Sequence, residues 1–236
     1  MERQPDIKSV NANKKHISIR PCSLFKSDPE SHDKLFFEKF FWDQGLFPVA
    51  GTDEVGRGCL AGPVVAAAVI LPKKVEMPNV TDSKALRASQ REHLVDQIKG
   101  KCIAWAIAEI GPEEIDKINI LEASLQAMKK AIKLLKPIPQ ALLVDGNKPV
   151  PTTIIQKTII KGDARSLSVA ASSILAKVHR DHIMKKLHRK YPQYGFDKHK
   201  GYPTKFHKEA LKKYGPCPHH RTTFKGVKEL VQCEKR

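Results

Sequence analysis

The chain has 236 residues, 41% of them hydrophobic, and its 42 Lys and Arg against 25 Asp and Glu give a formal charge of +17. This length can bury a sizeable core, yet no run approaches the roughly 20 apolar residues of a membrane span, and we expect no secretory leader in the polar first 20 residues. The composition argues against a membrane protein, a secreted disulfide scaffold, a collagen and a fully disordered chain.

The first half of the chain alternates predicted helices and strands. In chain order we expect a loose extension at 1–31, an amphipathic helix at 33–42, strands at 49–54 and 64–71, a helix at 89–99 and a strand at 103–109. The run 64–71 is apolar throughout, which is typical of a strand buried on both faces. Ser89 and Glu92 have the spacing of a capping box, which predicts the helix start.

The second half continues this alternation. In chain order we expect a short helix opening at 111–114, a helix at 119–135, strands at 141–144 and 152–160, a long helix at 166–190 and a last helix at 204–214. Asn119 has the side chain of a helix cap. Strands that alternate with helices predict an α/β domain with a central sheet flanked by helices.

The basic charge is concentrated near the C-terminus. Residues 177–236 carry 17 basic and 5 acidic side chains, a balance of +12, with tyrosines and phenylalanines interleaved. This pattern favours a polyanionic partner, most often nucleic acid, although a solvated basic helix that only aids solubility is the alternative. We therefore expect three regions: an extension at 1–31, a catalytic domain at 32–190 and a basic helical region at 191–236.

The cysteines and histidines suggest no special chemistry of their own. The five cysteines are scattered and form no Cys-x-x-Cys pair, which predicts a reduced, cytoplasmic protein. Seven of the ten histidines follow residue 178, and we expect most of them to face solvent and add to the basic surface.

Four acids stand at the ends of apolar segments: Asp53, Glu54, Asp145 and Asp163. Acids at strand ends and at a helix entrance can converge above a sheet. Carboxylate oxygens suit hard divalent ions, and two such ions can activate a water and stabilise a leaving oxygen in phosphodiester cleavage.

Each of these acids also has a purely structural interpretation. Asp163 can cap the helix that follows, and Asp145 with Gly146 forms a common turn dipeptide. Asp53 and Glu54 are adjacent, so strand alternation would point them to opposite faces unless the strand ends or bulges there.

A glycine-flanked arginine follows the acid pair. Gly56 and Gly58 allow the backbone to approach a ligand closely, and Arg57 between them can meet a phosphate. The alternative is a simple turn, and the segment lacks the pattern of a phosphate-binding loop. Tyr202 has a similar pair of interpretations, because it can stack under a sugar or base or can be a packed aromatic in a turn.

Taken together, several ordered blocks resemble bacterial ribonuclease HII, a type 2 ribonuclease H. The opening signature is TDEVGRGCLAGPVVAAA at 52–68, and the other blocks lie at 81–84, 144–147, 161–163 with 168–181, 201–204 and 220–221. Arg57 and the short N-terminal segment fit this family better than ribonuclease HIII, which typically has Lys there and a platform domain.

The resemblance implies a ribonuclease H-like fold with a mixed sheet and cleavage of RNA in RNA–DNA hybrids and at single ribonucleotides in DNA, leaving 5′-phosphate and 3′-hydroxyl ends. It implies Mg²⁺ or Mn²⁺ at the four acids, junction recognition by Gly56, Arg57, Gly58 and Tyr202, and a phosphate contact at Lys84. It matches Asp181 to a structural position. We expect a monomer and leave a contact with a replication clamp open.

Two other functions stay open. A general hybrid nuclease would lack the junction preference, and a basic RNA- or DNA-binding module would lack catalysis. The acids argue against the binding module, because carboxylates repel phosphate unless a metal ion intervenes.

Overall fold

The computed structural model describes residues 33–81, 83 and 86–233. A five-stranded sheet lies at the centre with the strand order β3-β2-β1-β4-β5. The strands are β1 (Val49–Val55), β2 (Val64–Ile70), β3 (Ala104–Ile110), β4 (Ala141–Asp145) and β5 (Ile155–Ile159). The pairs β1–β2 and β2–β3 are antiparallel, whereas β1–β4 and β4–β5 are parallel, so the sheet is mixed. The predicted α/β fold with a central mixed sheet is confirmed.

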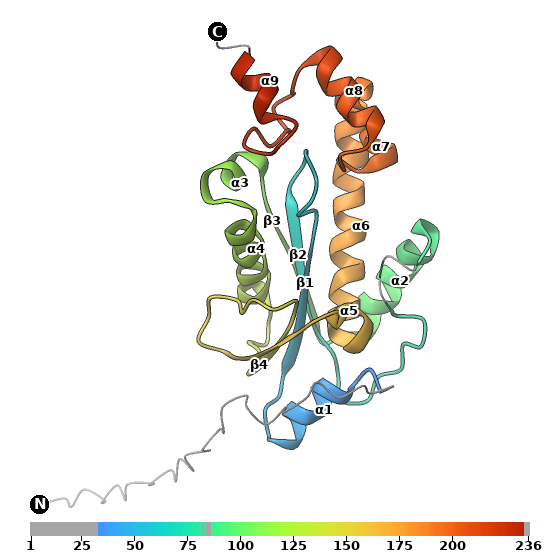
Figure 1. Ribbon diagram of the computed structural model, residues 1–236. Coiled ribbons are helices and arrows are strands. Elements are labelled where there is room, and N and C mark those ends of the chain that lie inside the picture. The colour runs from blue at the N-terminus through green and yellow to red at the C-terminus, as the bar shows by residue number, and fades with distance from the viewer. Residues whose placement is uncertain (1–32, 82, 84–85, 234–236) are drawn as a thin grey trace, which may run out of the picture. The chain divides into compact units, whose positions relative to one another are not determined.

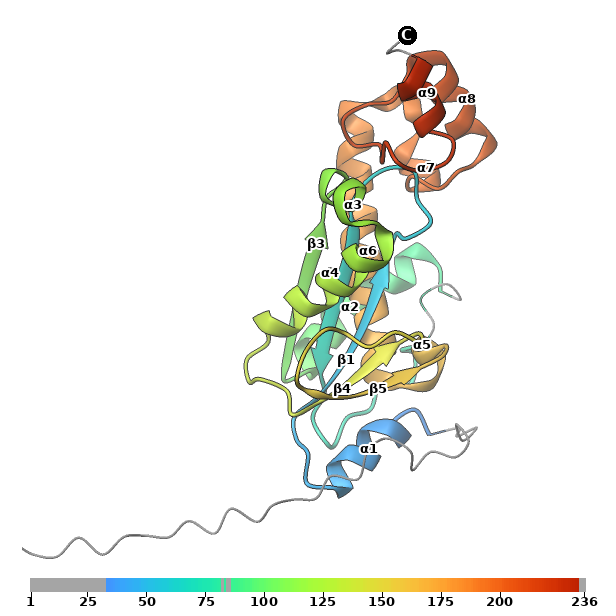
Figure 2. The same cartoon turned by 60° about the vertical axis from the view of Figure 1, so that its left-hand side comes forward.

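Helices cover both faces of this sheet (Figures 1 and 2). On one face lie α3 (Pro112–Ile118) and α4 (Ile120–Leu134), and on the other lie α2 (Ala88–Lys101) and the long α6 (Leu167–Lys190). Every residue of β2 is buried, as the uninterrupted apolar run predicts for a strand covered on both sides. Within α4, Met128 and Ile132 pack on the first face, and Ile174 of α6 packs on the second.

The C-terminal segments gather at the far end of α6 (Figure 1). They are a 3₁₀ turn (Pro192–Tyr194), α7 (Phe196–His199), α8 (Lys205–Tyr214) and α9 (Lys228–Cys233). Their apolar cluster includes Leu60 and Ala61 from the loop between β1 and β2. The C-terminal region therefore packs directly on the loop that follows the Asp53–Glu54 pair.

Several local predictions change at the level of single residues. The capping box at Ser89 and Glu92 is wrong, because α2 begins at Ala88 and the Gln90 side chain accepts a hydrogen bond from the Arg87 backbone N–H at 2.8 Å. Asn119 does cap α4, since its Oδ1 accepts two backbone N–H groups at 2.9 and 3.1 Å. β5 covers only Ile155–Ile159 of the predicted 152–160.

The extension predicted at 1–31 lies outside the described residues. Across the described part of the chain, none of the helices combines the length and the apolar character needed to cross a bilayer.

A buried acid joins helix α1 (Phe36–Asp43) to the start of α6. Glu38 is 1% exposed, and its Oε1 accepts hydrogen bonds from Ser166 Oγ at 2.7 Å and from Ser168 N and Oγ at 2.9 and 2.6 Å. Its Oε2 is buried without a hydrogen-bond partner. Burial raises the pKa of Glu38, against the opposing effect of the serine hydrogen bonds. The ionised form is thus disfavoured in the folded protein.

We expect Glu38→Ala to lower the free energy of unfolding by about 2–4 kcal/mol, because three buried donors lose their acceptor. Glu38→Gln keeps that acceptor and should change stability by less than about 1 kcal/mol. Because the folded-state pKa is raised, the wild type loses stability as pH rises from the ordinary Glu pKa through the folded value, and Glu38→Gln removes this component. Urea unfolding across pH 4–8 measures both effects, and equal stability of the Ala and Gln variants would contradict this role.

Candidate active site

The register of two parallel strands brings the first acids together. β1 and β4 pair with Thr52 opposite Val144, so Asp53 and Asp145 are the next residues along each strand. Strand alternation then places both side chains on the face that α6 covers. Strand alternation lets Asp53 and Glu54 share a site only if β1 ends or bulges at Glu54, and β1 does neither there. Instead β4 ends at Asp145, so Glu54 lies beside an open sheet edge.

The segment before α6 brings the fourth acid to the same place. The Gly162 backbone N–H donates to Asp145 Oδ1 at 2.7 Å, and Asp163 follows within the short helix α5 (Gly162–Arg165). Asp163 is 6% exposed. It does not cap α6, because Ser166 Oγ accepts the Val169 N–H at that position. The structural alternative for Asp163 is therefore wrong for this helix.

A glycine in β1 lets α6 approach the acids. A Cβ atom at Gly51 would lie 2.3–2.4 Å from backbone and side-chain atoms of Ser168 and Val169, closer than real Cβ contacts allow. Only glycine fits this crossing without moving the helix. The side chain of Ser173, further along α6, is then close enough to Asp53 to oppose the rise of its pKa.

The four acids repel one another electrostatically. The pKa of Asp53 is raised well above its usual value, first by burial and then by the charges of Glu54, Asp145 and Asp163, against a lowering hydrogen bond from Ser173. Burial also raises the pKa of Glu54, while Arg57 opposes this rise and Asp145 adds to it. A bound cation would relieve this repulsion, so the acids fit a divalent metal by charge and by their all-oxygen donor set.

Protein donors at present hold these carboxylates. Asp53 Oδ1 accepts the Glu54 backbone N–H at 2.7 Å, and Glu54 Oε1 accepts Arg57 Nη1 at 3.1 Å. Between residues 33 and 233, apart from 82, 84 and 85, no three His, Cys, Asp or Glu side chains form a ready-made metal ligand set. Metal binding would therefore need small rotations of these side chains.

The glycine-flanked loop and the tyrosine also meet. Gly56 has φ +99°, and a Cβ there would lie 2.2 Å from Arg180 Nε, so this position requires glycine. A Cβ at Gly58 would be 4.0 Å from the Tyr202 ring, which is 42% exposed. The exposed ring thus lies against Gly58, with the Arg57 side chain 51% exposed nearby in sequence. Lys84 lies outside the described residues.

Two fully buried arginines hold this loop, and the sequence analysis assigned neither a role. Arg221 donates to the carbonyl oxygens of Gly56 at 2.7 Å, Arg57 at 2.9 Å and Gly62 at 3.0–3.1 Å. Arg180 donates to the carbonyls of Pro63 at 2.9 Å, Ala61 at 3.0 Å and Lys200 at 2.8 Å. Together they fix the loop and the turn that precedes Tyr202.

A sequence signal for Arg180 did exist. It lies one helical turn from Ala176 and from Met184, both buried, so it interrupts an apolar stripe of α6. An arginine on such a stripe needs buried acceptors nearby.

The expectation that most of the seven histidines after residue 178 face solvent is wrong. Only His182 is exposed, whereas two are buried and four are half-buried: His179, His188, His199 and His219. His207 and His220 are 0% and 2% exposed, and their Nε2 atoms lie 3.0 Å apart. The Cys217 N–H donates to His220 Nδ1 at 2.9 Å, and His207 Nδ1 lies 2.9 Å from the Tyr202 carbonyl oxygen. Burial lowers the pKa of His207 to about 4 and that of His220 to about 3, so both are neutral at pH 7. They form a neutral hydrogen-bonded chain behind Tyr202.

Solved structures share this architecture. Ribonuclease H2 from Pyrococcus horikoshii OT3 superposes with a TM-score of 0.68 at 29% identity, covering 80% of this chain and 100% of that one. A ribonuclease HII from Archaeoglobus fulgidus, solved in complex with PCNA, gives 0.65 at 28% identity and covers 76% and 96%. The class defined by the fold is that of the ribonucleases H.

Sequence comparison then gives the family. The model of the ribonuclease HII family matches residues 50–227. A ribonuclease HII from Syntrophobacter fumaroxidans is 54% identical over 83% of this chain and 84% of its own length. The chain belongs to the ribonuclease HII family and is a ribonuclease H, an endonuclease for the RNA strand of RNA–DNA hybrids.

We expect the buried Arg221 and the half-exposed Arg57 to contribute very differently to the stability of the fold. Arg221→Met should lower the free energy of unfolding by about 3 kcal/mol, because several buried carbonyls lose their donor. Arg57→Met, at a half-exposed side chain, should change it by less than about 1 kcal/mol. Chemical denaturation of the two variants measures this, and equal losses would contradict the assignment of Arg221 as the internal support.

Proposed function

We propose that the chain cuts duplex DNA at single embedded ribonucleotides as well as cutting longer hybrids, by metal-dependent hydrolysis at Asp53, Glu54, Asp145 and Asp163. The observation that carries the proposal is geometric: the β1–β4 register puts Asp53 beside Asp145, and the Gly162 N–H that donates to Asp145 brings Asp163 to the same place. Burial first, and then the charges of the other three acids, raise the pKa of Asp53. A buried group of this kind is costly unless a cation compensates it.

The residues have distinct parts in this reaction. Divalent ions, Mg²⁺ or Mn²⁺, supply a water of lowered pKa and stabilisation of the leaving 3′ oxygen when bound. Asp53, Asp145 and Asp163 would hold them from the α6 side of the sheet, and Glu54 from its open edge. No side-chain nucleophile is required, and the products carry 5′-phosphate and 3′-hydroxyl ends.

In this proposal, the loop 56–58 and Tyr202 recognise the ribonucleotide. An RNA-specific site must detect the 2′-hydroxyl, which both donates and accepts hydrogen bonds. Gly56 and Gly58 present backbone that no side chain obstructs, and the Tyr202 ring against Gly58 can stack under a sugar or base. Arg57 meets a phosphate in this proposal, as does Lys84.

The basic region 191–236 adds contacts to the nucleic-acid backbone, and the protein acts as a cytoplasmic monomer. Deleting this region cannot test its charges alone, because the deletion also removes Arg221 and the cluster packed on Leu60. A basic binding module without catalysis is the competing function, and the acid cluster speaks against it.

We expect Asp145→Asn to reduce cleavage by more than about 100-fold while the protein stays folded. The amide oxygen can still accept the Gly162 N–H, but a neutral ligand no longer balances metal charge. In wild type, Mg²⁺ at 100 times its Kd should stabilise the fold by about 2.7 kcal/mol, and Asp145→Asn should lose most of this shift in thermal unfolding. Near-wild-type turnover at saturating Mg²⁺ would overturn the metal site.

We expect Tyr202→Ala to slow cutting at a lone ribonucleotide tenfold to a hundredfold, since a lost stacking partner costs about 1–3 kcal/mol. Cutting of a continuous hybrid should suffer less, and Mg²⁺ binding should change little. Tyr202→Phe, the matched control, should keep part of the activity if stacking dominates. Rates on the two substrates measure this, and an unchanged ratio in Tyr202→Ala would remove Tyr202 from junction recognition.

A further inference from the structure

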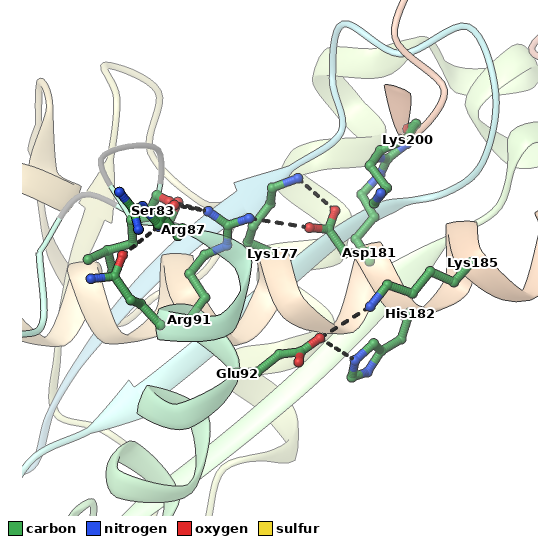
Figure 3. Close-up of polar contacts among 12 residues, drawn as sticks. Ser83, Arg87, Arg91, Glu92, Lys177, Asp181, His182, Lys185 and Lys200 are labelled. Carbon is green, nitrogen blue, oxygen red and sulfur yellow. Dashed lines mark hydrogen bonds and ion pairs between the residues drawn. The ribbon is translucent and has the colours of Figure 1, made fainter. Parts of the chain in front are cut away.

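A group of cations lies beside α6 (Figure 3). Arg91 comes from α2, Lys177 from α6 and Lys200 from the turn after α7, so three separate elements contribute. Asp181, which is 8% exposed, lies among them: Lys177 Nζ donates to its Oδ1 at 2.6 Å, and Arg91 Nη2 lies 3.6 Å from its Oδ2. We call Arg91, Lys177 and Lys200 the cation cluster.

The cation cluster has more charge than its acid can balance. Three positive side chains face one paired carboxylate among the described residues. Glu92 is engaged by Lys185 and His182, whereas Asp197, whose Oδ1 lies 3.3 Å from His188 Nδ1, adds a second negative charge near Lys200. The net local charge is therefore positive.

The cation cluster also has more hydrogen-bond donors than acceptors. Arg91 uses Nη1 on the Ser83 and Leu86 carbonyls, its Nη2 is too far from Asp181 for a hydrogen bond, and its Nε has no partner. Lys177 and Lys200 each direct one of three N–H groups to the protein, Lys200 to the Asp197 carbonyl. The Lys177 and Arg91 side chains are only 17% and 11% exposed, so water satisfies these donors incompletely. A phosphate offers the acceptors and the charge that are missing.

The position of the cluster relates it to the proposed cleavage site. Ser173, Lys177 and Asp181 lie four residues apart along α6 and so share one face of the helix. Ser173 is the residue of this face that acts on the pKa of Asp53. At 1.5 Å per residue, Lys177 and Asp181 lie about 6 and 12 Å along the helix from Ser173. Burial raises the pKa of the Cys59 thiol, next to Gly58, and the charge of Lys177 is among those that oppose this rise. The Lys177 charge of the cation cluster therefore acts on Cys59, directly after the loop 56–58 that we propose for recognition.

We propose that Arg91, Lys177 and Lys200 form a phosphate-binding subsite that anchors one backbone phosphate of the bound nucleic acid, with Asp181 between Lys177 and Arg91 as the carboxylate that pairs with both. The subsite rests on the proposed function, because it takes the same duplex as the acid cluster. A duplex rises 3.4 Å per nucleotide on each strand, so 6–12 Å places the phosphate about two to four nucleotides from the cut.

The test compares single charge removals by the salt dependence of binding. The ligand is duplex DNA with one ribonucleotide, in buffer without divalent ions, so that no cleavage occurs. Lys177→Gln and Lys200→Gln should each make the slope of log affinity against log salt shallower by about 0.9, the value for one lost phosphate contact. Lys130→Gln is the matched control, because Lys130 is an exposed lysine of α4 on the other face of the sheet. Its slope should equal that of wild type.

Neutral phosphates then locate the contact. In each duplex a single backbone phosphate, on one strand or the other, is replaced by an uncharged methylphosphonate. At one position two to four nucleotides from the ribonucleotide, it should weaken wild-type binding but leave Lys177→Gln unaffected. Unchanged slopes in both lysine variants would overturn the subsite, as would methylphosphonate effects that are the same for wild type and Lys177→Gln at every position.

Failure of the function itself has a separate signature. In this case wild type with Mg²⁺ does not cut the duplex, but both lysine variants show a shallower salt dependence of binding. One methylphosphonate also removes the difference in affinity between wild type and Lys177→Gln. The proposed function then fails and the phosphate subsite stands.

Discussion

The burial of two guanidinium groups against backbone carbonyls is the interaction on which the surface for nucleic acid depends. Burying a charge is costly unless hydrogen bonds compensate it, and Arg180 and Arg221 are both fully buried. Burial lowers the pKa of Arg221 to about 10, so it stays charged at neutral pH. Because its partners belong to the loop after β1, the charge can be accommodated only when that loop has one conformation.

This arrangement couples distant parts of the sequence. Arg180 comes from α6 and Arg221 from the segment after α8, yet both donate hydrogen bonds to backbone carbonyls in the segment 56–63. The neutral pair His207 and His220 then fixes the backbone at Tyr202 from behind. The C-terminal region therefore builds the recognition loop from inside, in addition to the basic charge that it places outside.

Unlike the two buried arginines with their hydrogen bonds, the acid cluster lowers the stability of the fold. The charges of Asp145 and Asp163 act unfavourably on the buried Asp53, and the β1–β4 register, the Gly162 N–H bond to Asp145 and the crossing of α6 at Gly51 keep the acids together. Sites of this kind reduce stability in exchange for function. The supporting arginines and the acid cluster thus lie at the same, C-terminal end of β1, where Asp53 and Glu54 are followed directly by the loop that Arg180 and Arg221 hold.

The sequence predicted the periodic and apolar features well, and the long-range contacts poorly. The uninterrupted run of β2 and the cap at Asn119 are local, so pattern alone identified them. The capping box at Ser89 failed because α2 begins one residue earlier, at Ala88, where Gln90 takes the capping place and leaves Glu92 to pair with Lys185 on α6. Glu54 was in doubt because its place depends on where the neighbouring strand β4 ends. The role of Arg221 was hidden because all its acceptors lie more than 150 residues earlier in the chain.

The most direct measurement is cleavage of a DNA duplex that carries one ribonucleotide, with and without Mg²⁺, followed by analysis of the product ends. The acids beside the loop that we propose to detect the 2′-hydroxyl predict a cut at that ribonucleotide only when Mg²⁺ is present, with 5′-phosphate and 3′-hydroxyl ends. Cleavage that persists after complete removal of divalent ions, or a cut that ignores the position of the ribonucleotide, would contradict it.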